Sequence, residues 1–434
     1  MTAHSQGNGG CVRRTRLDNG LRIVTEAMPE LRSVAVGFWA GTGSRDEPDA
    51  LAGASHFLEH LLFKGTETRS AQAIAEDVEA VGGEMNAFTT KEYTAYYVRL
   101  LDESLDLALD ILSEVVWAPA FRPEEVDCER QVILEEIRMH EDTPDELVHS
   151  LFSEALFPGE AVGREVLGQR EAIVAMTRDE IARFHAEHYR VENLVIAAAG
   201  NVDHDRMVEA IAARCTGGPG DRPPRPEAEI RPAGAVRVLH RPTEQAHLVL
   251  GMPALSRSDP DRWALSVLNH VIGGGMSSRL FQEVREKRGL AYSVYSYRSA
   301  LEDTGTFAVY AGTAPERAPE VLSIIGAELD RLGAERCLAP GELERAKGHF
   351  KGQMALGLES SSARMERIGR SEVTTGEIQS VDDMVAAIDA VTPDDMARVI
   401  DRVLGAGPRV LAAVGPVDGD DLAARLSVGS SSHG

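Results

Sequence analysis

Two histidines and a glutamate stand at spacings that could bind a metal ion. His56 and His60 lie four residues apart in a stretch with helical character, 54–63, and Glu59 follows His56 by three residues. Residues three and four apart share one face of a helix, so two imidazoles and a carboxylate can point at one ion. The apolar residues between them indicate a buried helix, where polar side chains need partners. A divalent metal would satisfy all three, and a hydrogen-bonded pair of core histidines is the alternative.

A second strongly helical stretch further along the chain offers acidic side chains as ligands. Glu129 and Glu136 lie seven residues apart, on one stripe that also carries Val132 and Ile133. Apolar residues on that stripe predict that both glutamates face inward. Glu135 is turned by about 100° from Glu136 around the helix, which makes it the weaker candidate. We therefore expect a third ligand from this stripe, and a solvated acidic face is the alternative.

A rival histidine cluster lies in the sequence FHAEHY. His185 and His188 are three residues apart, a spacing less suited to zinc than four, and no third ligand is evident nearby. We interpret this pair as residues that pack or cap a helix.

The elements that must position these residues form two related halves. A segment rich in Gly, Pro and charge, 216–235, predicts an exposed linker between residues 1–215 and 236–434. SRDEPD at Ser44–Asp49 resembles SRSDPD at Ser256–Asp261, an offset of 256 − 44 = 212 residues. In each half an apolar strand-like stretch precedes this sequence and helical runs follow it. We predict an α+β fold of two homologous domains, each a sheet with helices packed on it.

The candidate metal ligands and the glutamates beside them are not repeated in the second half. Pro123 and Pro340 are expected in the first turn of a long helix in each half, at an offset of 340 − 123 = 217 residues. At these offsets apolar or uncharged residues replace the candidate ligands. The counterparts of the two histidines and three glutamates are Leu268, Val271, Ile272, Ala346 and Gln353. We expect one half to bind metal and the other to lack it.

The combination of HFLEH with ERQVILEE resembles the pitrilysin-type zinc peptidases, the inverzincins, whose signature is HxxEH. The resemblance is to the small two-domain branch that includes mitochondrial processing peptidase and bacterial relatives. It implies that His56, His60 and Glu136 bind zinc and that Glu59 is the catalytic base. It further implies that Glu129 supports the metal site, and that the two domains enclose a substrate chamber.

The second half adds a match to this family. Arg285 and Tyr292, seven residues apart in REKRGLAY, resemble its Arg/Tyr pair. The resemblance implies that Arg285 grips substrate carbonyls and that Tyr292 helps to stabilise the oxyanion. Without it, this stretch indicates an amphipathic helix that runs into a strand. Gly273–Gly275 resembles the family's glycine-rich loop, and a turn that ends a helix is equally consistent with it.

The segment Glu84–Thr90 alternates after two glycines and predicts a strand. In the family this segment is an edge strand that pairs with an extended substrate through backbone hydrogen bonds. The resemblance implies that Asn86 and Ala87 line the bound peptide and that Phe88 lies beside the metal site. An ordinary half-buried strand is the alternative.

Taken with the resemblance, these residues predict a zinc-dependent endopeptidase that acts on extended peptides or unfolded segments. A non-catalytic scaffold or subunit of the same fold is the alternative, and such relatives usually lose HxxEH or the Arg/Tyr pair. Because both the zinc half and the Arg/Tyr half are on one chain, a homodimer is favoured over a heterodimer.

Composition excludes other classes of function. With 45 basic and 69 acidic residues the net charge is −24, which disfavours nucleic-acid binding. Part of this charge could attract basic peptides.

No apolar run is long enough to span a membrane, and the N-terminus lacks a signal-like apolar region, so we expect a cytoplasmic protein. Four cysteines without a CxxC pair suggest neither a thiolate zinc site nor a redox motif. The acidic candidates for a basic peptide are Glu84, Glu135, Asp142, Asp145 and Glu146.

Overall fold

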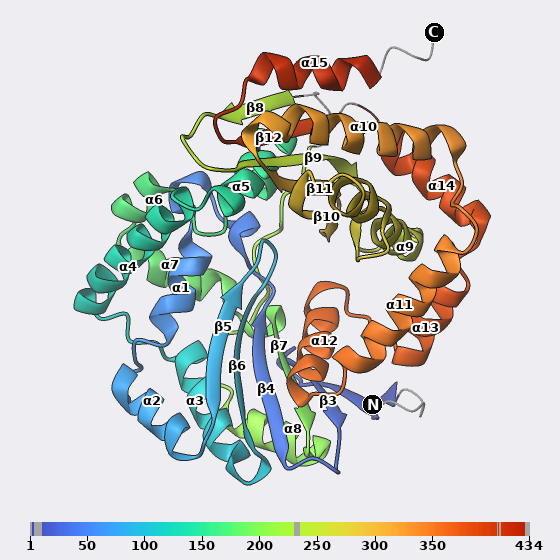
Figure 1. The fold of residues 1–434 in the computed structure, drawn as a ribbon. Coiled ribbons are helices and arrows are strands. Elements are labelled where there is room, and N and C mark those ends of the chain that lie inside the picture. Colours follow the sequence, from blue (N-terminus) through green and yellow to red (C-terminus); the bar gives the residue numbers. More distant parts are fainter. Residues whose placement is uncertain (1, 4–10, 230–234, 406, 408, 430–434) are drawn as a thin grey trace. The chain divides into compact units, whose positions relative to one another are not determined.

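The computed structural model shows an α+β protein, as predicted, with two sheets that are each covered by helices (Figure 1). The chain forms two compact units, which we describe separately. No helix within the described residues is long and apolar enough to cross a membrane. The described residues are 2–3, 11–229, 235–405, 407 and 409–429. The first unit comprises Met1–Ile137, Glu165–Pro226 and Met354–Met384; the second comprises Arg138–Arg164, Glu227–Gln353 and Val385–Gly434.

In the first unit the described strands form a seven-stranded sheet with β5 at one edge (Figure 1). Strands β3 and β7 are parallel, and the other neighbours are antiparallel. In spatial order the strands are β1 (Thr2–Ala3), β2 (Val12–Arg16), β3 (Arg22–Ala27), β7 (Leu194–Gly200), β4 (Ser33–Ala40), β6 (Thr94–Leu101) and β5 (Glu84–Thr89).

The central strands of this sheet are buried on both faces. In β4, the side chains of Val34, Val36 and Phe38 join a core with helices on one face, whereas Ala35 and Trp39 join a smaller core on the other. This follows from the alternation of side chains along a strand. The helices of the first unit are α1 (Ala54–Leu62), α2 (Ala71–Ala80), α3 (Leu105–Trp117), most of α4 (Pro123–Glu141), α6 (Arg170–Ala175), α7 (Arg178–His188), α8 (His204–Arg214) and α12 (Ser361–Thr374).

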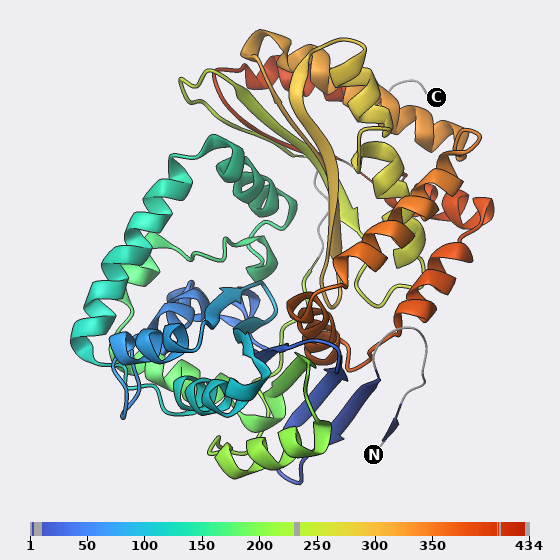
Figure 2. The ribbon, with the colours of Figure 1, turned by 60° about the horizontal axis from the view of Figure 1, so that its bottom comes forward.

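Helix α12 comes from the second half of the sequence but packs on the first sheet. It is the dark orange helix beside the blue and green strands in Figure 2. Gly369 lets it approach the indole of Trp39, since a Cβ there would come within 2.3 Å of the ring. Arg367 and Arg364 both pair with Glu26, which is buried in β3.

The second unit has a five-stranded sheet of the same topology. Its order β8-β12-β9-β11-β10 matches β3-β7-β4-β6-β5, and in each case the first two strands are parallel. The strands are β8 (Ala235–Leu239), β9 (Ala246–Ala254), β10 (Ala291–Ala300), β11 (Gly305–Thr313) and β12 (Val410–Val414). The helices are α5 (Pro144–Leu156), α9 (Arg262–Gly273), α10 (Ala318–Glu335), α11 (Glu342–Gly357), α13 (Val381–Asp389), α14 (Pro393–Leu404) and α15 (Gly419–Gly429), of which α11 and α13 cross a boundary between the units.

Each unit contains one helix from the other half of the sequence. The predicted domains, 1–215 and 236–434, are contiguous and do not include this arrangement. Helix α5 precedes the linker, yet Val148 and Phe152 pack on the second sheet. Helix α12 follows the linker and packs on the first. Residues 216–229 of the predicted linker form neither helix nor strand.

Two further boundaries differ from expectation. Pro123 begins α4, as predicted, but Pro340 lies two residues before α11, which starts at Glu342. Helix α9 ends at Gly273, so the glycine-rich segment is the end of a helix in this structure.

Candidate metal centre

Helix α1 is fixed at its start by a buried carboxylate. Gly53 adopts a φ of +102°, a backbone conformation that residues other than glycine rarely adopt. The Glu47 carboxylate accepts hydrogen bonds from the backbone N–H groups of Gly53 and Ser55, both at 2.7 Å. These donors would otherwise be unpaired at the helix N-terminus, where a negative charge is also favourable.

His56, His60 and Glu136 converge as the ligand spacing predicted. Oε2 of Glu136 lies 3.7 Å from Nε2 of His56 and 3.5 Å from Nε2 of His60. The three potential ligand atoms lie within 4.8 Å of one another. Ligand atoms around a tetrahedral zinc ion stand roughly 3.3 Å apart, given bonds of about 2.0 Å.

Two observations show that a metal ion fits this group. Oε2 of Glu136 is buried and has no hydrogen-bond partner among the described residues, which is costly for a carboxylate oxygen. Burial, and secondarily the neighbouring His60, lower the pKa of His56 to about 4. His56 is therefore a neutral imidazole at neutral pH, the form that binds metals. Two imidazoles and one carboxylate are a common ligand set of catalytic zinc, which leaves a coordination position open.

Glu129 supports the group from α4, and Lys64 supports Glu129. Oε2 of Glu129 lies 3.0 Å from Nδ1 of His60, and its Oε1 lies 2.8 Å from Nζ of Lys64. A carboxylate on the second ring nitrogen fixes the tautomer and orientation of a ligating histidine. The Glu129 side chain is only 3% exposed, so the lysine also balances a buried negative charge.

Glu59 is held by a strand residue. The hydroxyl of Thr89, in β5, donates a hydrogen bond of 2.6 Å to Oε2 of Glu59. Burial raises the pKa of Glu59, and the hydrogen bond from Thr89 partly opposes that shift. A carboxylate with a raised pKa is a stronger base than an exposed one, as proton transfer requires.

The strand predicted at Glu84–Thr90 exists as β5, but its side chains alternate differently from our expectation. Ala87 packs in the core that contains α1, and Thr89 faces Glu59. Phe88 instead contacts Trp39, with ring centroids 5.7 Å apart, on the face covered by α12. The prediction that Phe88 lies beside the metal site is therefore wrong for its side chain. Asn86 is exposed, and its Oδ1 accepts a hydrogen bond from the backbone N–H of Ala87.

Arg285 and Tyr292 lie in the second unit and contact each other. Arg285 lies in the last turn of a short helical segment, Phe281–Glu286, and Tyr292 lies at the start of β10. The guanidinium carbon of Arg285 lies 4.6 Å from the ring centroid of Tyr292, a cation–π contact. Tyr292 is 80% exposed, which is unusual for so large a side chain and leaves its hydroxyl available to a ligand.

Sequence reasoning missed three residues of the site: Lys64, Thr89 and Glu47. Lys64 follows His60 by four residues, so helical spacing could have identified it. Thr89 shares the face of Ala87 by strand alternation. No sequence signal identifies Glu47. Of the residues predicted to face inward on α4, Ile133 is buried but Val132 is 40% exposed, which corrects that part of the prediction.

The rival pair, His185 and His188, has a structural role, as predicted. Nε2 of His185 lies 2.9 Å from the carbonyl oxygen of Val116, and its ring stacks on Tyr189. Nδ1 of His188 lies 3.3 Å from the hydroxyl of Thr42.

Comparison with known proteins places this site in a family. Residues 22–170 match the model of insulinase (peptidase family M16), and residues 175–349 match the peptidase M16 inactive domain. The chain belongs to peptidase family M16. The M16 relatives include an uncharacterised zinc protease of Streptomyces coelicolor, 52% identical over 96% of this chain and 92% of its own length. Another, from Bacillus subtilis, is 39% identical over 88% of this chain and 92% of its own length.

Two solved structures share the fold. A protease from Helicobacter pylori superposes with a TM-score of 0.87 at 24% identity, covering 94% of this chain and all of the other. A structure from Pseudomonas fluorescens, described as a peptidase M16 inactive domain, has the same TM-score at 22% identity, covering 94% of this chain and 99% of the other. The candidate metal ligands lie in the part that matches the insulinase model, and Arg285 and Tyr292 lie in the part that matches the inactive domain.

Proposed function

We propose that this M16 protein is a zinc-dependent endopeptidase of the inverzincin type, similar to processing peptidases. One observation carries the proposal: the convergence of His56, His60 and Glu136 next to a partly buried carboxylate, Glu59, that is not among these three potential ligands. Hydrolysis of an amide needs an activated water and a group that moves its proton, and this arrangement provides places for both. Relatives named zinc proteases support the choice of metal.

The chain's own residues would divide the work as follows. Zinc bound by the three ligands supplies a Lewis acid that lowers the pKa of water and polarises a carbonyl. Glu59 takes a proton from the attacking water and then gives it to the leaving amine. Thr89 holds the Glu59 carboxylate at 2.6 Å during this transfer. Glu129 orients His60 through the contact of 3.0 Å with its Nδ1.

Strand β5 is the proposed binding site of the substrate. It is the last strand of its sheet in the described structure, so one side of its backbone is not paired within that sheet. An extended peptide can add to such an edge by backbone hydrogen bonds, with little dependence on sequence. Asn86 and Ala87 would line the peptide, and Phe88 would contribute its backbone, since its side chain is held on the opposite face.

The second unit is proposed to contribute Arg285 and Tyr292 to the same reaction. Arg285 would bind a substrate carbonyl, and the exposed hydroxyl of Tyr292 would donate to the developing oxyanion. Basic peptides are the proposed preference because of the net charge of −24, and the proposed assembly is a homodimer.

Incubation of the purified protein with an unstructured peptide mixture tests the proposal, with the cuts mapped by mass spectrometry. We expect cleavage at internal peptide bonds, loss of cleavage with a zinc chelator, and recovery when zinc is added back. Absence of cuts by protein shown to contain one zinc per chain would favour the non-catalytic scaffold. Sedimentation velocity would separate a monomer from a homodimer.

A further inference from the structure

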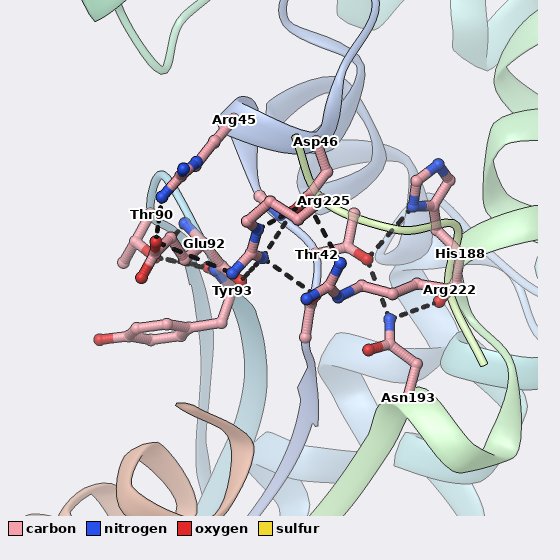
Figure 3. A network of polar contacts seen from close by, with 12 residues as sticks. Thr42, Arg45, Asp46, Thr90, Glu92, Tyr93, His188, Asn193, Arg222 and Arg225 are labelled. Carbon is pink, nitrogen blue, oxygen red and sulfur yellow. Dashed lines mark hydrogen bonds and ion pairs between the residues drawn. The ribbon is translucent and has the colours of Figure 1, made fainter. Parts of the chain in front are cut away.

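The middle of the linker, at Arg225 and Pro226, is bound into a buried cluster of charges. We call Arg45, Asp46, Glu92 and Arg225 the anchor cluster (Figure 3). Arg225 donates two hydrogen bonds of 2.8 Å to Asp46, one from Nε to Oδ1 and one from Nη2 to Oδ2. Nη1 of Arg45 donates a hydrogen bond of 2.8 Å to Glu92. All four side chains are at most 8% exposed.

The anchor cluster joins three segments that are far apart in sequence. Nη2 of Arg225 also donates to the carbonyl oxygen of Glu92 at 2.8 Å, and Nη2 of Arg45 donates to the carbonyl oxygen of Pro226 at 3.1 Å. One set of contacts therefore connects the linker with the turn between β5 and β6 and with the segment after β4. Arg222 adds a longer contact of 3.8 Å to Asp46.

The segment after β4 leads directly to the metal helix. Gly43 approaches the β5–β6 turn so closely that a Cβ there would lie 2.2 Å from the carbonyl oxygen of Thr90. The backbone N–H groups of Ser44 and Arg45 donate to the carbonyl oxygens of Thr90 and Lys91, at 3.1 and 2.9 Å. The next residue after the cluster's Asp46 is Glu47, whose carboxylate caps α1.

The β5–β6 turn is also connected to Glu59, the proposed catalytic base. Thr90 follows Thr89, the residue that donates to Glu59. Displacement of the turn would move this donor, and displacement of the segment after β4 would move the start of α1. Buried ion pairs seldom add stability over apolar replacements, and fixing a specific arrangement is one documented use of them.

From these contacts we infer that Arg225 is a positioning residue of the catalytic site. It holds the β5–β6 turn and the start of α1 in mutual register, so that Glu59, Thr89 and His56 keep their geometry. The linker is thereby part of the active-site support as well as a connection. This inference rests on the proposed peptidase function for its kinetic readout, and on hydrogen exchange for an independent one.

The decisive variant is Arg225→Met in the full chain, matched with Arg190→Met. Arg190 also holds the linker, through the carbonyl oxygen of Pro219 at 3.0 Å, but it does not contact the anchor cluster in the described structure. For Arg225→Met we expect kcat on a peptide substrate to fall by about tenfold to a hundredfold, because misplaced catalytic groups cost that much. We expect KM to change by less than about threefold, since the backbone edge of β5 remains. Arg190→Met should keep the wild-type kcat.

Hydrogen exchange on the metal-free protein gives the second readout. The amide of Tyr93, in the β5–β6 turn, donates to the hydroxyl of Thr90 at 3.1 Å. In Arg225→Met the amides of Ser44, Arg45 and Tyr93 should exchange faster, whereas those of β11 in the second unit should not change. If the wild type cleaves no peptide, the proposed function fails, but this exchange pattern still tests the coupling. Because loss of one member of a buried ion pair is strongly destabilising, Arg225→Lys provides a milder change. It keeps the charge but loses the two-pronged contact, and we expect an intermediate kcat and intermediate exchange rates.

A folded Arg225→Met protein with wild-type kcat and exchange would overturn the inference. So would equal losses of kcat in Arg225→Met and Arg190→Met, since that result indicates only general attachment of the linker. If Arg225→Met does not fold, a wild-type kcat in Arg225→Lys, with unchanged exchange at Ser44 and Tyr93, would also overturn it.

Discussion

Helices α1 and α9 occupy equivalent places on two sheets of the same topology, but their side chains differ in kind. At the ligand positions α1 carries His56, Glu59 and His60. At the offset of the repeat, α9 carries buried apolar residues, Leu268, Val271 and Ile272. The fold therefore needs only an apolar helix at this place. Ionisable side chains in a core oppose stability, so their presence on α1 has a cost that the fold itself does not require, which is consistent with the proposed chemistry.

The partner helices, α4 and α11, show the same contrast. The buried carboxylate of Glu129 in α4 is replaced by a buried methyl group, Ala346, in α11. Helices α9 and α11 are joined instead by a stack of His270 on His349, with ring centroids 4.0 Å apart. One unit holds this helix pair through charged groups and a proposed metal, and the other through apolar and aromatic contacts.

The largest expected effect comes from Glu59→Gln, which tests whether the chemistry belongs to α1. We expect kcat/KM to fall by about 10²- to 10⁴-fold because the variant cannot accept a proton, as measured by initial rates on one peptide. Zinc binding should remain, since Glu59 is not a ligand. The matched control is Glu124→Gln, a change at an exposed glutamate in the first turn of α4, which should keep the wild-type rate. Wild-type activity in Glu59→Gln would remove this residue from the mechanism.

Removal of zinc is expected to lower the stability of the first unit and to leave that of the second unit unchanged. A ligand at about a thousand times its Kd stabilises the native state by about 4 kcal/mol. A chelator should therefore speed hydrogen exchange in α1 and α4 but not in α9 and α10. Glu136→Gln should exchange like the chelated wild type even when zinc is present, whereas Glu135→Gln should respond to zinc like the wild type. Equal loss of protection in both units would contradict the assignment of the metal to the first.

Much of the site could be predicted because it is encoded by local spacing. Helical periodicity brings His56 and His60 together, and the stripe on α4 favoured Glu136 over Glu135. The same stripe gave the wrong answer for Val132, because the face of α4 that packs on its neighbours is narrower than the pattern suggests. Periodicity indicates that a side chain belongs to an apolar stripe, but the edge of that stripe depends on the neighbouring helices.

Contacts between distant segments could not be predicted in this way. Nothing in the sequence of β5 indicates that Thr89 meets α1, because strand alternation gives a face but not the helix that covers it. The exchange of α5 and α12 has the same cause. An amphipathic helix has an apolar face that any apolar sheet can cover, and the connection alone does not say which sheet does so.

Acid should destabilise the first unit through His185. Burial lowers the pKa of His185, in the first unit, from its ordinary 6.5 to about 4. Between these values the unfolded chain binds more protons than the folded one, so stability is full above pH 6.5 and is lost as pH falls towards 4. A full shift of this size corresponds to about 3 kcal/mol, and the ring's partial contact with solvent reduces this to about 1–2 kcal/mol. Urea unfolding of the chelated protein at pH 7.5 and 5.0 measures the loss.

His185→Gln keeps an N–H that can donate to Val116 and does not titrate. Its free energy of unfolding should depend less on pH than that of the wild type, although it should be lower at pH 7.5 because the stacking on Tyr189 is lost. The control is His240→Gln, a change at an exposed histidine of the second unit. Equal pH dependence in the wild type and His185→Gln would show that His185 does not cause the acid sensitivity.

The smallest expected effect concerns Lys64, and it compares two lysine–carboxylate pairs of similar length. Lys64 in the first unit lies 2.8 Å from Glu129, and Lys351 in the second lies 2.8 Å from Asp389. Lys64→Met should weaken zinc binding by about tenfold, since residues behind a ligating histidine affect affinity by about 10–100-fold and this one acts through Glu129. Competition with a chromophoric chelator measures the affinity.

Two variants make this comparison specific. Lys64→Arg should restore most of the affinity, because a guanidinium can also hold the Glu129 carboxylate towards His60. Lys351→Met should leave zinc binding unchanged, since its partner is 49% exposed and such surface pairs contribute little. If both methionine variants weaken zinc binding equally, the effect is a general one of charge. The contact between Lys64 and Glu129 would then have no special role at the metal, and the contrast between the units would rest on the ligands alone.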